Sequence, residues 1–190
     1  MKRLMMIALM MCSTLVSFGQ DSLFILNQDG LTDYIVTNCD GKTQNDLYKK
    51  TLDWILVTYN TPSSVIKAQI ENNYIRIEGS AGHLVRFGGL GATSCLTKYQ
   101  IEISFKDGKY KFDLLNMEIY VPPSQYAVRS GWCDFNLSER FKTKSYVNDE
   151  GDVRPLYKHC HEIPSYFNSL NMSLKSFIQS ENIPSKSKDW

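Results

Sequence analysis

Apolar and polar residues alternate along several stretches of this chain, and this period of two predicts antiparallel strands. Two alternating runs, Tyr99–Phe105 and Tyr110–Leu114, are joined by Asp107–Gly108. An Asp-Gly pair between such runs is typical of a tight hairpin. A second strand pair is predicted over Val65–Gly79, with its turn at Asn72–Asn73.

The same pattern indicates where the strands begin and where they are interrupted. Tyr34–Val36 is predicted to form a first strand. After the hairpin the apolar positions shift by one residue, so we expect a β-bulge near Leu115–Asn116, before Pro122–Pro123 ends the strand. The glycine-rich stretch Gly79–Gly91 is predicted to be looser, with one short strand over Leu84–Phe87.

Two segments instead show a helical period. Thr43 stands three residues before Asp46, as in a capping box, and apolar residues then recur every three or four positions as far as Tyr59, before Pro62. The second helix is expected over residues 164–181, with Pro164 at its first position.

Together these elements predict a single α+β domain over residues 20–183. Each element has one apolar side, and packing two main helices on one face of a mostly antiparallel sheet of about four to six strands buries all of them. Residues 124–162 give no clear pattern, although Cys133–Phe135 is a candidate strand and Asn148–Gly151 a candidate turn. Residues 184–190 are expected to form a flexible tail.

The first nineteen residues resemble a secretory signal peptide. Lys2 and Arg3 precede the apolar run Leu4–Val16, and small residues at Ser17 and Gly19 suit cleavage before Gln20. The run is too short for a membrane-spanning helix, and no later segment approaches the roughly 18 apolar residues that a span needs. We therefore expect an exported protein, periplasmic or extracellular, without a transmembrane span.

Charge and composition exclude some functions. The chain carries 21 basic and 20 acidic residues. A near-neutral chain has no long-range field to attract phosphates, so nucleic acid is not an expected partner. No cofactor motif is present: Gly88–Gly91 lacks both the P-loop ending and the dinucleotide spacing, and is expected to be a loop. The acidic residues Asp149, Glu150 and Asp152 crowd the predicted turn at 148–151 and are expected to be solvated.

The cysteines carry information because the compartment is expected to be oxidising. Cys12 lies within the leader and lacks the small preceding residues of a lipoprotein signal. The other four, which are disulfide candidates, allow three pairings that the sequence does not separate, and buried free thiols are the alternative. Pairing of Cys133 with Cys160 is the pairing we expect. The four candidates are Cys39, Cys95, Cys133 and Cys160.

Several stretches together resemble a family of secreted bacterial proteins of unknown function whose domain has a TATA-binding-protein-like (TBP-like) fold. The resemblance implies a core at about residues 30–125, formed by a curved antiparallel sheet backed by helices. It implies no activity and supplies no catalytic or ligand residues, and the name of the fold does not imply DNA binding. The stretches that carry it are Gly30–Val36, Leu47–Ile55, Val65–Gly79 and Tyr99–Phe112.

His159, Cys160 and His161 form the most chemically suggestive group in the sequence. In a strand, His159 and His161 share one face and are weak candidates for a metal site, while Cys160 beside two imidazoles is a candidate nucleophile. No further ligand stands at a recognised spacing. The alternative is a pair of surface histidines beside a structural cysteine, so we predict no metal and no catalytic residue.

Aromatic residues are scattered through the irregular second half. Tyr126, Trp132, Phe141 and Tyr146 are candidates for a surface that binds a peptide, a glycan or an envelope protein, although they also suit a structural cover for the sheet. The expected function is therefore a non-catalytic binding or assembly module of the cell envelope. The alternative is a hydrolase or a thiol or metal enzyme centred on His159, Cys160 and His161.

Overall fold

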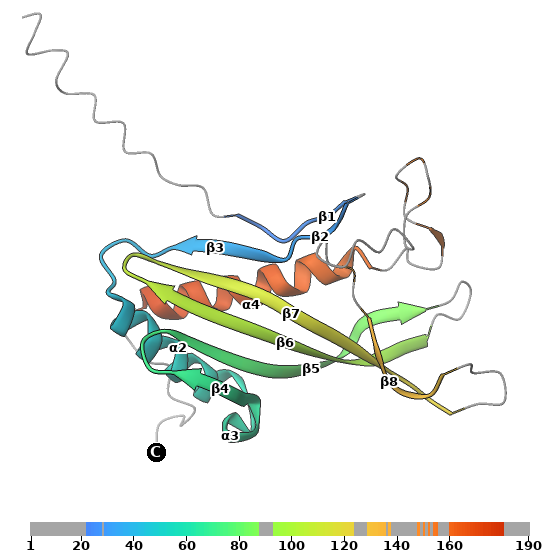
Figure 1. The fold of residues 1–190 in the computed structure, drawn as a ribbon, viewed down its shortest axis with the longest axis horizontal. Helices are drawn as coiled ribbons and strands as arrows, with labels where there is room; N and C mark the ends of the chain where they lie inside the picture. Colours follow the sequence, from blue (N-terminus) through green and yellow to red (C-terminus); the bar gives the residue numbers. More distant parts are fainter. Residues whose placement is uncertain are drawn as a thin grey trace, which may run out of the picture.

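The computed structural model places an antiparallel sheet against two long helices (Figure 1). Two short strands, β1 (Leu26–Asn27) and β2 (Gly30–Leu31), pair beside it. The residues that the structure describes are 22–27, 29–87, 93–123, 129–135, 137, 148, 150, 152, 154–155 and 160–180.

The main sheet has six strands in the order β3-β7-β6-β5-β4, with β8 pairing β7 beyond the end of β3. Every pairing is antiparallel, as the alternation predicted. The strands are β3 (Tyr34–Asn38), β4 (Ile66–Ile70), β5 (Tyr74–Phe87), β6 (Thr93–Lys106), β7 (Lys109–Val121) and β8 (Gly131–Asp134).

Both predicted hairpin turns and the predicted bulge are confirmed. Gly108 has a φ of 74° between β6 and β7, and Asn72 has a φ of 60° between β4 and β5. Gln100 pairs with Asn116 whereas Ile101 pairs with Leu114, so Leu115 is the extra residue of the bulge. The bulge restores the alternation, since Met117 and Ile119 are buried beyond it.

The first long helix, α2 (Gln44–Thr58), begins where its sequence predicts. Thr43 Oγ1 accepts the amide of Asp46, and the Asp46 carboxylate accepts the amide of Thr43, which completes the capping box. These hydrogen bonds from Thr43 lower the pKa of Asp46. Pro62 does not simply end the helix: it opens the short helix α3 (Pro62–Val65) that leads into β4.

The last helix, α4 (Glu162–Gln179), begins two residues before the predicted start, so Pro164 lies within its first turn rather than at its first position. The first-turn site remains compatible with proline because the amide that proline lacks has no partner within the helix there. The tail predicted at 184–190 lies outside the described residues.

The stretch predicted to be loose is part of a long strand. β5 continues through residues 79–87 and pairs with β6 along most of its length, with a register irregularity between Ala81 and Val85. Leu84–Phe87 are therefore the end of β5, not an isolated short strand. The irregularity breaks the period of two, which is why the alternation was not visible in the sequence.

The core lies between the sheet and the two helices. Ile35, Phe112, Ile101 and Ile75 come from successive strands of the sheet, and each is fully buried. They meet the buried sides of α2 and α4, which also contact each other. From α2 these are Leu47, Trp54 and Ile55, and from α4 they are Ile163, Phe167, Leu174 and Ile178.

Three tyrosines link the two helices to the sheet inside this core. The Tyr99 hydroxyl lies 2.8 Å from that of Tyr166 on α4 and 3.5 Å from that of Tyr59 at the end of α2. Burial raises the pKa of Tyr59 to about 12 and raises the pKa of the other two phenols as well, so all three stay neutral at physiological pH. The cluster joins the sheet to both helices through hydrogen bonds.

Candidate functional site

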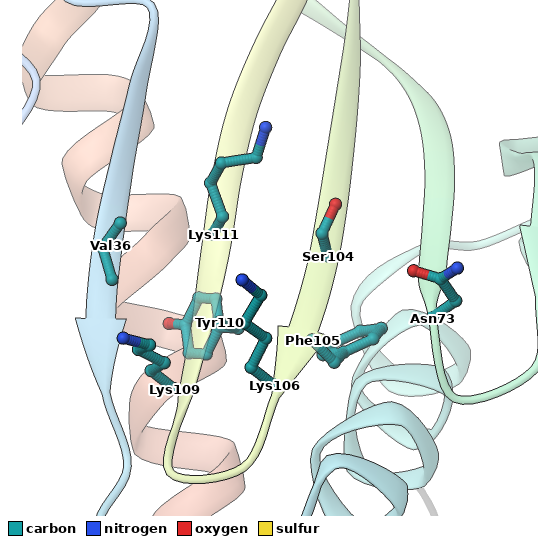
Figure 2. Close-up of a pocket in the computed structure, with 8 residues that line it drawn as sticks. All are labelled: Val36, Asn73, Ser104, Phe105, Lys106, Lys109, Tyr110 and Lys111. Carbon is teal, nitrogen blue, oxygen red and sulfur yellow. The ribbon is translucent and has the colours of Figure 1, made fainter.

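The sheet face opposite the helices is the open face of the molecule. Side chains alternate between the two faces of a strand, so the polar set predicted from the sequence points away from the helices. Figure 2 shows both helices behind the strands, with Val36, Lys111 and Ser104 in front of them. Among the described residues, no helix covers this open face.

Across its middle, the open face is neutralised by its own ion pairs. Lys111 Nζ lies 2.8 Å from Asp113 Oδ2, and Arg76 Nη2 lies 2.8 Å from Glu102 Oε2 on the facing strand. Lys67 reaches Glu78 at 3.2 Å. These pairs leave the central part of the open face without excess charge.

A hollow of about 430 Å³ lies at one end of the open face, beside the β6–β7 hairpin. We call it the lysine pocket. Lys106, Lys109 and Lys111 surround it, with the Ser104 hydroxyl and the Asn73 amide at its side (Figure 2). Val36, Phe105 and Tyr110 complete the lining.

The charges of the lysine pocket are only partly neutralised. Lys106 and Lys109 are direct partners across the hairpin, a placement in which like charges repel. Within the part of the chain that the structure describes, neither makes an ion pair. The neighbouring Asp107 is turned away, because its Oδ1 accepts the Gln44 amide at the start of α2, 2.8 Å away.

This arrangement is suited to an anion. Lys106 and Lys109, which form no ion pair with any described residue, supply charge, and the serine hydroxyl and asparagine amide supply neutral donors beside them. Lysine acts as a flexible point charge, so the pocket accepts a phosphate, a sulfate or a carboxylate without demanding a bidentate geometry. Binding would relieve the repulsion between Lys106 and Lys109.

These lysines do not stand out in the sequence as a candidate site. The whole chain is nearly neutral, and the three residues are separated along the sequence, so no basic run marks them. One signal was available: Lys109 and Lys111 share the polar side of a predicted strand, and the Asp107–Gly108 turn brings Lys106 opposite Lys109. Pairing across hairpins, and not charge along the chain, reveals the site.

The opposite end of the open face carries a row of exposed apolar side chains, here called the aromatic row. Trp132 on β8 is the direct partner of Tyr120 on β7, and their rings make an edge contact with centroids 5.5 Å apart. Continuing the β6–β7 register by one residue places Leu96 opposite Tyr120. Of the four aromatic candidates, Trp132 is thus placed at an exposed site, whereas Tyr126, Phe141 and Tyr146 lie outside the described residues.

Comparison with known proteins finds one family model that matches part of the chain. Residues 34–120 match the family model described as a domain of unknown function (DUF4468) with TBP-like fold. This segment is a match to DUF4468. The resemblance to a family of unknown function with a TBP-like fold is therefore confirmed, and the matched segment contains β3 through most of β7, including the whole lysine pocket.

Two crystal structures show the same fold. A TBP-like protein from Parabacteroides distasonis aligns with a TM-score of 0.53 and 11% identity, covering 77% of this chain and 90% of that one. A DUF4468 family protein from Bacteroides ovatus aligns with a TM-score of 0.53 and 11% identity, covering 83% of this chain and 91% of its own. No curated protein matches the chain. The DUF4468 match thus brings a fold and no activity.

The group at residues 159–161 is not brought together as a strand. Cys160 and His161 lie in the turn that precedes α4, and His159 lies outside the described residues. Cys160 is 1% exposed and His161 is on the surface, so the two side chains occupy different environments. Burial raises the pKa of the Cys160 thiol to about 12, the opposite of the lowered value that a nucleophile needs.

The structure places the cysteines and part of the other candidate groups. Cys133 and Cys160 are not joined by a disulfide in the structure, so the expected pairing of these two residues is not formed. Within the described residues, no group of three metal-ligating side chains comes together. Gly88–Gly91 lies outside them. Asn148 does form a turn, since its side-chain oxygen accepts the amides of Glu150 and Asp152.

None of the helices that the structure describes is long and apolar enough to cross a membrane.

Proposed function

We propose that this DUF4468-type chain is a non-catalytic binding module of the cell envelope, which takes an anionic group of its ligand in the lysine pocket. The observation that carries the proposal is the pair Lys106 and Lys109, held opposite each other without an ion-pair partner among the described residues. Keeping two like charges together costs stability, and a bound anion offsets that cost.

The size of the pocket favours a small anionic group over a nucleic acid. A duplex is bound by neutralising a row of phosphates along a basic surface. Here the central cations of the open face are already paired with carboxylates, as in Arg76 with Glu102. One concentrated positive site at the end of a neutral face suits a single phosphate, sulfate or carboxylate group.

Charge removal tests the lysine pocket. We expect the double variant Lys106→Ala/Lys109→Ala to bind inorganic phosphate at least about tenfold more weakly than the unchanged protein, since each charge-assisted hydrogen bond contributes about 1.5–3 kcal/mol. The measurement is a titration followed by the amide NMR signals of the β6–β7 hairpin, at constant ionic strength.

Lys49→Ala is the control for removing a lysine elsewhere on the surface, because Lys49 is an exposed lysine of α2, outside the pocket lining. This control should bind phosphate as the unchanged protein does. Equal weakening by the control and by the double variant would contradict the proposal, as would an unchanged protein whose hairpin signals do not move.

Export is the second part of the proposal, and the leader carries it. Lys2, Arg3 and the apolar run to Val16 support secretion, and small residues precede Gln20. When the full chain is expressed in a Gram-negative host, we expect to recover it outside the cytoplasm. Its mass should be that of a chain whose first residue is Gln20. A full-length product retaining Met1 in the cytoplasmic fraction would contradict export, without bearing on the lysine pocket.

A further inference from the structure

We propose that the aromatic row stacks against a sugar ring, so that the ligand of this module is an acidic carbohydrate. This inference rests on the proposed function, because it assigns the acidic substituents of the same ligand to the lysine pocket. It begins with the exposure of the row. The side chains of Leu96, Tyr120 and Trp132 are 48%, 38% and 37% exposed, whereas the opposite face of the sheet is almost completely buried.

The row is built from three adjacent strands, which fixes its shape. Tyr120 and Trp132 are cross-strand partners on β7 and β8, and Leu96 extends the row onto β6. Side chains anchored on paired strands lose little conformational entropy on binding, and the rings of Tyr and Trp supply large rigid contact areas. The result is a preformed apolar platform, in which the two rings are inclined at 64° to each other.

Charged groups surround this platform and indicate what covers it. Lys98 Nζ lies 3.8 Å from the centre of the Trp132 ring, which holds the indole in place by a cation–π contact. Glu118 is the direct partner of Lys98 across β6–β7 and of Asp134 across β7–β8. An apolar protein surface would bury these charges without partners, at a large cost.

A carbohydrate avoids that cost. Its ring presents C–H groups to an aromatic surface, while its hydroxyls donate to carboxylates such as Glu118 and accept from the Lys98 ammonium. An apolar platform with charged groups around it therefore suits a sugar better than it suits an apolar partner.

The two ends of the open face are linked by one uninterrupted strand. From Ser104 at the lysine pocket to Leu96 in the aromatic row, β6 runs eight residues, or roughly 26 Å at strand spacing. An extended chain of several sugar units reaches both ends. The central ion pairs leave no excess charge between the two ends of the open face. A sugar chain therefore gains most of its binding free energy at these two ends.

The test compares, by titration calorimetry, how tightly the protein without its leader binds three probes. They are a neutral oligoglucan, an oligogalacturonate of matched length, and inorganic phosphate. We expect oligogalacturonate to bind most tightly. Trp132→Ala should weaken it about tenfold while leaving phosphate binding unchanged, since a tenfold loss corresponds to about 1.4 kcal/mol, which is within the range of one aromatic contact. Lys106→Ala/Lys109→Ala should weaken both acidic probes.

Two further variants separate stacking from damage to the fold. Trp132→Phe keeps a ring on β8 and should retain most of the binding, whereas Leu56→Ala removes an exposed apolar side chain from α2 and should change nothing. The inference is overturned if Trp132→Ala binds oligogalacturonate as tightly as Leu56→Ala does, or if no oligosaccharide binds. Phosphate binding that depends on Lys106 and Lys109 is a separate measurement. The proposed function can therefore hold even if the inference about the sugar fails.

Discussion

Replacing Gly79 by alanine is expected to destabilise the protein by about 3 kcal/mol, although alanine is the better strand former. Gly79 and Tyr99 are direct partners on β5 and β6, and a Cβ at position 79 would overlap the Tyr99 ring. The ring has nowhere to move, since it is 2% exposed, bonded to the Tyr166 hydroxyl at 2.8 Å and packed edge-on against Phe167. Urea unfolding measures the loss.

Gly82 on the same strand is the matched control. A Cβ at that position meets nothing within 4 Å, so Gly82→Ala should change the free energy of unfolding by no more than about 0.5 kcal/mol. In the double variant Gly79→Ala/Tyr99→Leu, the two losses should be less than additive because the obstructing ring is gone. A Gly79→Ala protein as stable as Gly82→Ala would show that the ring does not lie over this glycine.

Asn171→Leu is the second substitution with a large expected effect, a loss of about 2 kcal/mol. Asn171 is a buried polar residue on α4 that joins the helix to two strands. Its Oδ1 accepts the Tyr110 hydroxyl at 2.8 Å, and its Nδ2 donates to Thr37 Oγ1 at 3.0 Å. Leucine has a similar size but leaves the Thr37 hydroxyl, which is fully buried, without this partner.

The asymmetry of buried hydrogen bonds supplies the internal check. Adding Thr37→Val to Asn171→Leu should recover part of the lost stability, because both polar groups are then replaced by apolar ones. Met172→Leu, at the adjacent and exposed position, should be nearly neutral. If Asn171→Leu is as stable as Met172→Leu in urea unfolding, the buried network contributes nothing to joining α4 to the sheet.

The sequence predicted the local features of the sheet but not the packing at Gly79. The alternation in Tyr99–Phe105 and Tyr110–Leu114 correctly predicted the central hairpin, and the shift of parity placed the bulge at Leu115. Local signals sufficed there because hairpin register and capping depend on residues close together in the chain. The role of Gly79 as space for a ring on another strand left no such signal.

The lysine pocket and the aromatic row could not be predicted in the same way. Trp132 was recognised as a candidate, but its partner Tyr120 and the cation of Lys98 come from two other strands. The His159–His161 group drew attention because its members are adjacent in sequence, yet Cys160 is buried and His161 exposed. Closeness along the chain was a poor guide to closeness in space.

The amino-acid sequence by itself determined the class of fold, the antiparallel pairing and both long helices, because hydrophobic periodicity, turns and caps act over a few residues. Only the tertiary structure decided which polar side chains share the open face and which of them remain without a counter-charge. That selection depends on strand register and on which residues Asp107 and Glu102 pair with, and such long-range pairing is settled only when the whole sheet forms.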